Sequence, residues 1–415
     1  MPARPRPAVL TTDCGQGPEP DRVAGPRRPA HILICNIPEH GHVNPTLAIV
    51  ADLVRRGHRV SYPTTDQFAG RVAEAGATPL VHRSTLPGGG SDLEWPSDLA
   101  AGLDLFLTEA VDVAPRLLAA FADDRPDLVV HDIAAHAGRV LATRWSVPSV
   151  GLSPTHAIAP STAREFDRLY ASNADWIAYR ARLAGFLREH GITLVDDAFP
   201  GPPESCVVTI PREFQLRPKT IPENYVFVGP CLRAGDAQAT WVPPAADRKV
   251  LYISLGTCYA NRPDFYRECV DAFAGLDPWH LVLSVGRLDP AELGPLPGNA
   301  EVHDSVPQLD VLRRASAFVT HAGMGSVLEA LTYGVPMVAV PQAVDQPMNA
   351  RQIGRLGLGT WLSPARATAE ALRDAVLDVS SAEDIAGRLD RMRRAIAVSG
   401  GPHAAADVIE RALTA

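Results

Sequence analysis

Short apolar runs alternate with helical segments along most of the chain, and this alternation is what most limits the fold. HILICNIP (31–38) is typical of a buried strand, a helix with Asn44 as N-cap and Pro45 at its first position follows, and Gly57 ends it before the strand HRVSYPTT. The same order returns around PDLVVHDI, KVLYISLGT and SAFVTHAG. Successive βαβ units predict an α/β fold with parallel sheets covered by helices on both faces.

The length of 415 residues exceeds what one ordinary core holds, and a Pro-rich stretch separates two series of βαβ units. We therefore predict two facing, doubly wound, Rossmann-like domains. The final helix has no strand partner, so packing back onto the N-terminal domain is one option for it. The predicted parts are a disordered N-terminal extension (1–29), an N-terminal domain (30–220), a linker (221–245), a C-terminal domain (246–400) and a C-terminal helix (401–415).

Charge and composition exclude several classes of function. The net charge is −8 and no run is rich in Lys and Arg, which argues against a nucleic-acid partner. No apolar stretch reaches the roughly 18 residues of a membrane helix, and the first thirty residues lack the apolar core of a secretory signal. The six cysteines are scattered without metal-ligand spacing. We expect a cytoplasmic protein with reduced thiols, no membrane partner and no bound metal.

Polar residues stand where two strands of the N-terminal series end, which is the ligand edge of such sheets. PEHGHVNP brings His40 and His42 after the first strand, and Asp132 ends PDLVVHD. Histidine is the natural general base near neutral pH, and a carboxylate could orient its ring. The alternatives are a histidine that bonds locally in the turn and an Asp132 that caps the next helix.

In the C-terminal series, the sequence from His321 to Ser326 (HAGMGS) lies between a strand and a helix. The N–H groups of Gly325 and Ser326 would then point from a helix N-terminus, which favours an anion. The stretch lacks the GxxxxGK[ST] and GxGxxG patterns, so ATP hydrolysis and hydride transfer lose support. Thr257, after Ser-Leu-Gly at another strand end, is a weaker candidate.

Three further polar residues follow in the same stretch. Glu329 could be the capping-box partner of Ser326, or it could accept hydrogen bonds from ribose hydroxyls. Asp345 and Gln346 follow the strand VPMVAVP, where they could accept from sugar hydroxyls or form an ordinary solvated loop.

These residues together resemble a known family. The pattern Pro307-Gln308 … His321-x-Gly323-x-x-Ser326 … Glu329 … Asp345-Gln346-x-x-Asn349 resembles the nucleotide-sugar signature of the GT-B UDP-glycosyltransferases, most closely the antibiotic-inactivating actinomycete macrolide glycosyltransferases. NIPEHGHVNPTLAIVADLVRRGHRVSY resembles their acceptor-domain opening. The resemblance implies a deep interdomain cleft, with His42 as base and Asp132 as its partner. It implies a donor site of Thr257, His321, Gly323, Gly325 and Ser326 at the diphosphate, Gln308 at the nucleotide base, Glu329 at the ribose, and Asp345 and Gln346 at the sugar.

One position departs from the family pattern. Ser305 stands where the family often has a Trp that stacks on uracil, and a lost stacking face costs about 1–3 kcal/mol. Arg287 could replace it, because a guanidinium plane also stacks on bases. The choice between UDP and dTDP donors therefore stays open.

The resemblance implies an inverting hexosyltransferase that moves a sugar, glucose by expectation, from UDP to a hydroxyl of an amphipathic natural product such as a macrolide, inactivating the antibiotic. The nucleotide sugar is a co-substrate, and no cofactor is expected. Alternatives are a biosynthetic transferase using a dTDP-deoxysugar, a nucleotide-sugar epimerase and a non-catalytic helper of the same fold. The oligomeric state stays open. Candidate acceptor-lining side chains, any of which could instead be core, are Trp95, Phe106, Phe166 and Tyr170.

Overall fold

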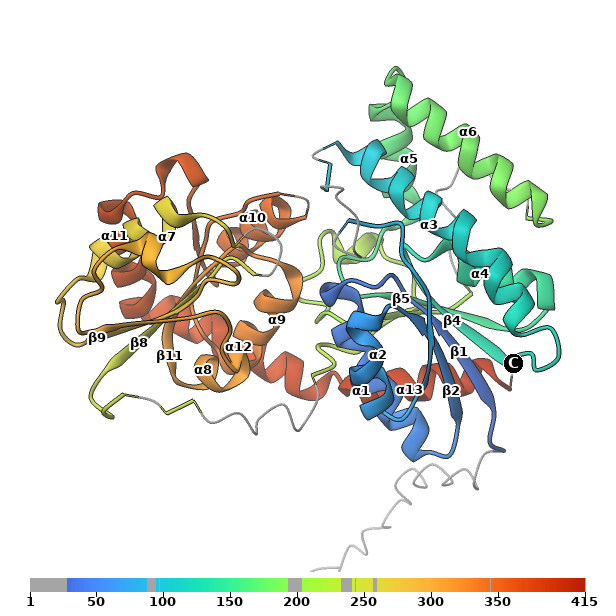
Figure 1. Cartoon of the computed structure of the whole chain (residues 1–415), viewed down its shortest axis with the longest axis horizontal. Coiled ribbons are helices and arrows are strands. Elements are labelled where there is room, and N and C mark those ends of the chain that lie inside the picture. Colours follow the sequence, from blue (N-terminus) through green and yellow to red (C-terminus); the bar gives the residue numbers. More distant parts are fainter. Residues whose placement is uncertain are drawn as a thin grey trace, which may run out of the picture.

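The computed structural model describes residues 28–87, 95–96, 98–192, 204–232, 241–242, 244–256, 260–343 and 345–414. It contains two parallel sheets, one in each half of the chain (Figure 1). The first has seven strands in the order β3-β2-β1-β4-β5-β6-β7, and the second has six in the order β10-β9-β8-β11-β12-β13. In both, the strand order reverses beside the first strand, as in doubly wound folds. The predicted pair of Rossmann-like sheets is confirmed.

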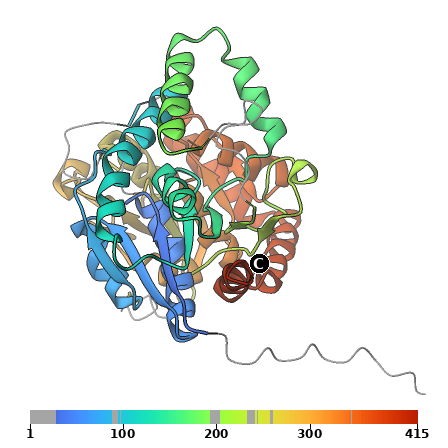
Figure 2. The ribbon, with the colours of Figure 1, turned by 90° about the vertical axis from the view of Figure 1, so that its right-hand side faces the viewer.

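The elements of the first half are a sheet and the helices that cover it. They are β1 (His31–Cys35), α1 (His40–Arg55), β2 (Arg59–Thr64), α2 (Asp66–Glu74), β3 (Thr78–Val81), α3 (Leu99–Ala120), β4 (Leu128–Asp132), α4 (His136–Trp145), β5 (Ser149–Ser153), α5 (Pro160–Leu169), α6 (Ala174–Glu189), β6 (Cys206–Val208) and β7 (Tyr225–Phe227). Helices α5 and α6 form a hairpin that projects from this half (Figure 2).

The second half repeats the scheme and ends in three helices. Its elements are β8 (Lys249–Ser254), α7 (Pro263–Phe273), β9 (Trp279–Ser284), β10 (Ala300–His303), α8 (Gln308–Arg314), β11 (Ala315–Thr320), α9 (Met324–Tyr333), β12 (Met337–Ala339), α10 (Gln346–Leu356), β13 (Gly359–Trp361), α11 (Ala369–Ser381), α12 (Glu383–Val398) and α13 (Gly401–Ala412). Short 3-10 turns occur at Pro218–Thr220, Pro290–Leu293 and Pro364–Arg366.

The strands are apolar on both faces because helices cover both. In β1, Ile32 and Ile34 belong to the core cluster that contains residues of α1 and α13, while Leu33 and Cys35 belong to the cluster that contains residues of α3, α4 and α6. Successive side chains of a strand point to opposite faces, so a strand between two helix layers needs an unbroken apolar run. This is why continuous runs such as HILIC, rather than alternating ones, mark these strands.

The start of α1 differs from the prediction. The helix begins at His40 with Glu39 as N-cap, not at Asn44, because the Glu39 carbonyl already accepts the N–H groups of His42 (2.9 Å) and Val43 (2.8 Å). Pro45 lies inside the helix, where it removes only the bond to the Gly41 carbonyl. The predicted end is confirmed, since Gly57 follows the helix with a φ of +94°. His42 therefore stands in the first helical turn.

The two halves share one apolar cluster. Phe214 and Ile221 of the first half belong to the same cluster as Ala350 and Ile353 of α10. The Gln352 side chain also donates to the Phe214 carbonyl (2.9 Å). Residues 233–240 and 243 of the predicted linker, like residues 1–27 of the predicted extension, lie outside the described residues. The exact domain limits therefore stay a prediction.

Helix α13 returns to the N-terminal half and packs beside α1 (Figure 1). Its Ala405 and Ile409 belong to the same cluster as Leu47 of α1. The chain turns into α13 at Gly400, whose φ of +86° suits glycine, and the Gly401 N–H donates to the Val228 carbonyl (2.8 Å). Among the described residues, no helix is long and apolar enough to cross a membrane.

An ion-pair network fixes α13 to α1. The Arg56 guanidinium donates to Asp407 (2.6 Å) and Glu410 (2.8 Å), and it also bonds Asp52 (2.8 Å). His58 Nε2 lies 3.0 Å from the second oxygen of Glu410. The Arg56 side chain is only 13% exposed and that of Glu410 only 9%. Breaking such a pair on one side leaves a carboxylate poorly solvated, which costs more than the pair itself contributes.

We therefore expect Arg56→Ala to lower the free energy of unfolding by about 3 kcal/mol, measured by urea denaturation. The matched control is Arg55→Ala, next in the chain, whose side chain is 67% exposed and, among the described residues, pairs with Asp52. An exposed pair contributes about 0–1 kcal/mol, so the control should change stability little. Equal losses in the two variants would contradict a role for the Arg56 network in holding α13.

Candidate functional site

His42 and Asp132 meet at the point where the strand order of the first sheet reverses. His42 is in the first turn after β1, and Asp132 is the last residue of the neighbouring β4. His42 Nδ1 lies 2.8 Å from Asp132 Oδ2, and the other carboxylate oxygen, Oδ1, accepts the Ala134 N–H (2.7 Å). Asp132 thus bonds the histidine and also braces the turn before α4. The alternative that Asp132 caps the next helix is wrong, because Ala135 is the N-cap of α4 and no side chain caps it.

The dyad is partly open on the histidine side. The Asp132 side chain is fully buried, whereas that of His42 is 23% exposed. Because Asp132 occupies Nδ1 and no described residue hydrogen-bonds Nε2, the second ring nitrogen of His42 is free to take a proton. His40, the other histidine of the turn, instead lies 3.1 Å from the Gln67 amide and packs edge-on against Phe68.

Acidic groups around His42 make it more basic. Burial lowers the pKa of His42, but the charge and hydrogen bond of Asp132, with the charges of Glu39 and Asp345, raise that pKa above its ordinary value overall. Burial raises the pKa of Glu39 itself to about 7, against the opposing charge of His42. Asp345 precedes α10 in the C-terminal half, so its effect on His42 joins the dyad to the other half of the protein.

A buried polar network behind α1 holds the histidine turn, and the sequence analysis did not identify it. Asn36 Nδ2 donates to the His42 carbonyl (2.6 Å) and to the Tyr62 hydroxyl (3.0 Å). Thr46 Oγ1 lies 2.7 Å from the same hydroxyl. The sequence feature that could have indicated this network is Asn36, a polar residue directly after the apolar strand HILIC. The network fixes the backbone on which His42 stands.

In the C-terminal half, α9 begins after the strand β11, as predicted. Gly323 is the N-cap, and the first bond into the helix runs from the Val327 N–H to the Gly323 carbonyl (3.0 Å). The N–H groups of Met324, Gly325 and Ser326 therefore have no partner within the helix. A Cβ added at Gly325 would meet nothing within 4 Å, so open space lies over this end.

His321 is held between two glycines. A Cβ at Gly256 would lie 2.6 Å from His321 Nε2, and one at Gly323 would lie 2.4 Å from it, so neither position admits a side chain without moving the ring. Gly256 also has a φ of +76°. Burial lowers the pKa of His321 to about 4, against a hydrogen bond with the Ser254 backbone. At neutral pH the ring is uncharged and can meet an anion only as an N–H donor.

Three predicted donor-site residues form one hydrogen-bonded group. The Gln308 amide donates to Ser326 Oγ (3.3 Å) and to the Glu329 carboxylate, and its carbonyl oxygen accepts from the Tyr252 hydroxyl (2.8 Å). The capping-box alternative for Glu329 is wrong, because Gly323 rather than Ser326 is the N-cap and Glu329 lies in the second turn of α9. Tyr252 was not predicted, since a tyrosine within an apolar strand is usually core.

Asp345 and Gln346 separate in their roles. Asp345 Oδ2 accepts from Asn349 Nδ2 (2.8 Å), and burial raises the pKa of Asp345 despite that bond, its own backbone and the charge of His42. The side-chain oxygen of Gln346, Oε1, already accepts the backbone N–H groups of Gln342 (2.8 Å) and Ala343 (3.2 Å). Gln346 is buried and braces the loop, so only its NH₂ group remains for a ligand.

The remaining donor-site predictions are less defined by the structure. Thr257 lies outside the described residues. Ser305 and Arg287 are both exposed, and the choice between them at the nucleotide base stays a prediction. Among the described residues, no group of three or more His, Cys, Asp or Glu side chains is placed to hold a metal ion.

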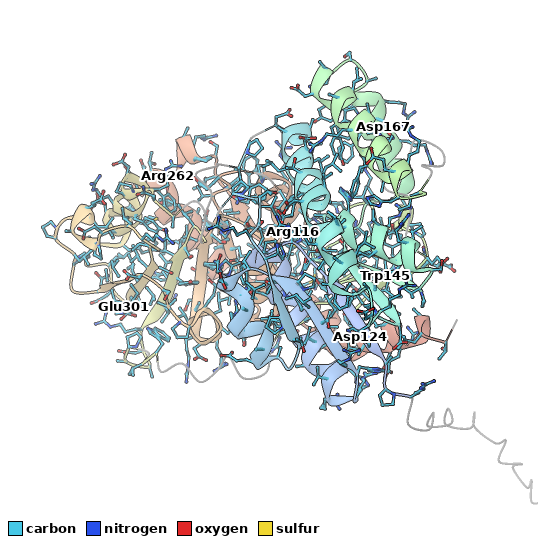
Figure 3. The ribbon with its side chains drawn as sticks, turned by 45° about the vertical axis from the view of Figure 1, so that its right-hand side comes forward. Arg116, Asp124, Trp145, Asp167, Arg262 and Glu301 are labelled. Atoms are coloured by element: carbon cyan, nitrogen blue, oxygen red, sulfur yellow. The ribbon has the colours of Figure 1, made fainter. Side chains whose placement is uncertain are left out.

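The four aromatic acceptor candidates fall into two groups. Trp95 and Phe106 lie together, with ring centroids 5.7 Å apart. Phe166 and Tyr170 belong to the projecting α5–α6 hairpin, where Tyr170 stacks on Trp176 at 5.3 Å. The Trp176 indole donates to Asp167 (3.1 Å), which Figure 3 shows within this hairpin.

A pocket lies at the carboxyl edge of the first sheet, and neither His42 nor Asp132 is among the residues that line it. Asn36 and Ile37, which follow β1, and Ala134 and Ala135, which follow β4, form one side of it. The rest of its lining comes from β1, β2, the residue after β3, α3 and α4, and is mostly apolar: Cys35, Pro63, His82, Phe106, Glu109, Ala110, Val113, Leu117 and Ala137. Phe106 thus lines the pocket, whereas Phe166 and Tyr170 do not.

Known proteins share this architecture over nearly the whole chain. The family described as UDP-glucoronosyl and UDP-glucosyl transferase matches residues 204–389. The oleandomycin glycosyltransferase of Streptomyces antibioticus is 45% identical, over 93% of this chain and 92% of its own. The NDP-glycosyltransferase YjiC of Bacillus licheniformis is 38% identical, over 92% and 97%. The crystal structure of the glycotransferase of kitacinnamycin has a TM-score of 0.85 and 40% identity, over 93% and 99%.

The motifs, the two facing doubly wound sheets and the extent of these matches lead to one assignment. The chain belongs to the UDP-glycosyltransferase family, whose members transfer glycosyl groups and have the GT-B fold.

Proposed function

We propose that the protein transfers glucose from UDP-glucose to a hydroxyl group of an amphipathic natural product, a macrolide being the favoured class, with inversion at the anomeric carbon. The proposal that the product is an inactivated antibiotic follows from the resemblance of the sequence and from the name of the oleandomycin glycosyltransferase. The name of the second relative, an NDP-glycosyltransferase, is consistent with a nucleotide diphosphate sugar as donor.

The observation that carries the proposal is the bond between His42 Nδ1 and Asp132 Oδ2 (2.8 Å) beside a carboxylate of the other half, Asp345. A base with a fixed tautomer and a free Nε2 can remove a proton from a neutral alcohol. An epimerase would need acid and base groups aimed at the sugar ring, and a helper protein would have no use for a raised histidine pKa.

The proposed reaction forms one bond and breaks one. The acceptor hydroxyl oxygen attacks the anomeric carbon while its proton moves to His42 Nε2, and the bond between that carbon and the diphosphate oxygen breaks. Asp132 holds the Nδ1 proton and offsets the positive charge that the ring gains. A single displacement inverts the anomeric centre, so an α-linked donor gives a β-glucoside.

Negative charge develops on the departing diphosphate, and the start of α9 is where this charge would be met. The unbonded N–H groups of Gly325 and Ser326 and the positive end of the helix favour an anion there. His321 lies beside this end as a neutral ring, since burial lowers its pKa to about 4. Donors that are fixed before the reaction stabilise the leaving group without reorganising.

The first expected outcome concerns the reaction itself. With UDP-glucose and a panel of macrolides and phenols, the purified protein should release UDP only when an acceptor is present, and mass spectrometry should find the acceptor heavier by one hexose. dTDP-glucose in a parallel series tests whether Ser305 relaxes the choice of nucleotide. Rearranged sugar without transfer, or release that no acceptor stimulates, would exclude the proposed function.

The dyad supplies the second expected outcome. His42→Ala should lower kcat by about 10²–10⁴-fold while UDP still binds, because only the base is lost. Asp132→Asn should also lower kcat, and it should move the acid limb of the pH profile of kcat/KM to lower pH. The sign follows from the Asp132 charge, which raises the pKa of His42. Without that charge the pKa of His42 falls, so the ring loses its proton at a lower pH.

His40→Ala is the matched control for the dyad, since His40 lies in the same turn but bonds Gln67. We expect this variant to keep most of the activity and an unchanged pH profile. If His40→Ala were the inactive variant, or if Asp132→Asn left the acid limb in place, the assignment of the base would be wrong.

The start of α9 supplies the third expected outcome. Gly325→Ala adds a methyl group where the protein leaves open space, so folding should be unaffected. The backbone N–H is retained, but the added methyl group occupies space over the helix end and keeps the diphosphate from approaching it. UDP binding, measured by calorimetry, should therefore weaken by about 1.5–3 kcal/mol, the value of a lost hydrogen bond to a charged group. Gly185→Ala in α6 also points into open space and should leave UDP affinity unchanged. An unaltered affinity of Gly325→Ala would remove this helix end from the donor site.

A further inference from the structure

His156 is a buried histidine, where the two halves of the protein meet, that the proposed reaction does not use. It follows β5 in the N-terminal half and is only 4% exposed. Its ring stacks on that of Phe214, with the ring centroids 5.6 Å apart. The Phe214 carbonyl accepts from Gln352 of α10 (2.9 Å), and Asn349 lies three positions earlier in the same helix. Residues three apart share a helix face, so Asn349 faces the segment that holds His156.

The surroundings of His156 fix the position of its ring proton. Burial lowers the pKa of His156 to about 4, so the ring is uncharged at neutral pH. The Leu216 backbone N–H donates to His156 Nδ1 (3.3 Å), and a ring nitrogen that accepts a hydrogen bond carries no proton. The proton therefore lies on Nε2. This nitrogen is buried and has no ordinary hydrogen-bond partner among the described residues.

Asn349 offers the matching acceptor from the C-terminal half. Its Nδ2 donates to the Ala322 carbonyl (3.0 Å) and to Asp345 Oδ2 (2.8 Å), which uses both of its N–H bonds. Its Oδ1 is fully buried and has no ordinary hydrogen-bond partner in the described part of the chain. One buried donor and one buried acceptor thus remain, on His156 and Asn349. The Asn349 side chain also opposes the effect of burial on the pKa of His156, as an acceptor beside the ring does.

We propose that His156 is a positioning residue of the donor site, which acts through Asn349 to hold the Asp345 carboxylate against the donor sugar. The Nε2–H of His156 bonds Asn349 Oδ1, and this bond keeps the amide turned so that Nδ2 points to Asp345. Hydrogen bonds of an active site tighten when the substrate binds, so the bond is shortest in the donor complex. The inference rests on the proposed function, because it assumes that Asp345 accepts a hydroxyl of the sugar. His156 itself touches no substrate.

The test separates the two nitrogens of the ring. His156→Gln keeps a donor near the position of Nε2 and loses the acceptor for Leu216, whereas His156→Asn keeps that acceptor and loses the donor. Each variant gives up one hydrogen bond, so urea denaturation should find similar stabilities. His156→Asn should raise KM for UDP-glucose about 2- to 10-fold, the effect of one hydrogen bond, while His156→Gln stays near the wild type. Both variants should bind UDP as the wild type does, because UDP has no sugar for Asp345 to hold.

His190→Asn is the matched control, since it makes the same substitution at the end of α6, where the ring packs edge-on against Phe186. It should alter neither KM nor UDP affinity. Equal values of KM in His156→Gln and His156→Asn would overturn the proposal. A loss of UDP affinity in His156→Asn as large as the rise in KM would assign His156 to general support of the interface, and would overturn it as well.

A measurement on the wild-type protein separates the inference from the proposed function. Nitrogen NMR of the histidine-labelled protein should find His156 uncharged at neutral pH with its proton on Nε2. A proton on Nδ1 would overturn the inference even if both variants failed to fold, while glucose transfer by the same protein would still uphold the proposed function. If the wild-type protein transferred glucose to no acceptor, the proposed function itself would fail, and the role of His156 with it.

Discussion

Parallel pairing brings the carboxyl ends of neighbouring strands to one edge of a sheet, and the site depends on this constraint. β1 and β4 are neighbours through the register Leu33 to Val129, so the residues that follow them in the chain meet although 90 positions separate His42 from Asp132. The same relation joins β8 to β11, which is why Gly256 lies against His321. Both constellations stand where the strand order reverses, since there the helices leave in opposite directions and open a space.

The environment gives similar side chains opposite chemical properties. His42 has acidic neighbours that raise its pKa, whereas His321 has glycines around it and a pKa of about 4. The first can gain a proton during the reaction, and the second stays neutral. The two aspartates also differ in their contacts, because Asp132 bonds His42 and the Ala134 N–H whereas Asp345 bonds Asn349.

Much of the fold could be predicted from the sequence because short stretches of residues determine where its strands and helices lie. Unbroken apolar runs mark strands covered on both faces, and Gly57 marks the end of α1. The start of α1 could not be predicted, because Asn44 and Pro45 form a stronger local signal than Glu39, whose carbonyl accepts the first helical bonds. Capping preferences describe isolated turns, and here the residues after β1 continue directly into the helix.

For the site, the residue types at the strand ends were sufficient to identify His42 and Asp132 as a pair of candidates, and the structure brings them together. Hydrogen bonds between residues that are far apart in the chain could not be predicted from the sequence. Glu329 accepts a hydrogen bond from Gln308 and does not form a capping box with Ser326. The Gln346 side chain accepts from the backbone of its own loop. Tyr252, in β8, donates to Gln308. None of these partners is fixed by spacing, because each contact forms only when separate elements pack.

Helix α13 makes the first half of the protein depend on the last residues of the chain. Ala405 and Ile409 complete the apolar face of α1, and Arg56 pairs with Glu410 more than 350 positions away. During synthesis the first sheet can therefore pair its strands early, but the face of α1 that packs against α13 stays uncovered until α13 leaves the ribosome. Contacts of such sequence separation are slow to form. Chaperones bind apolar surface that is exposed on a nascent chain. The docking of α13 therefore determines when the folded protein no longer binds chaperones.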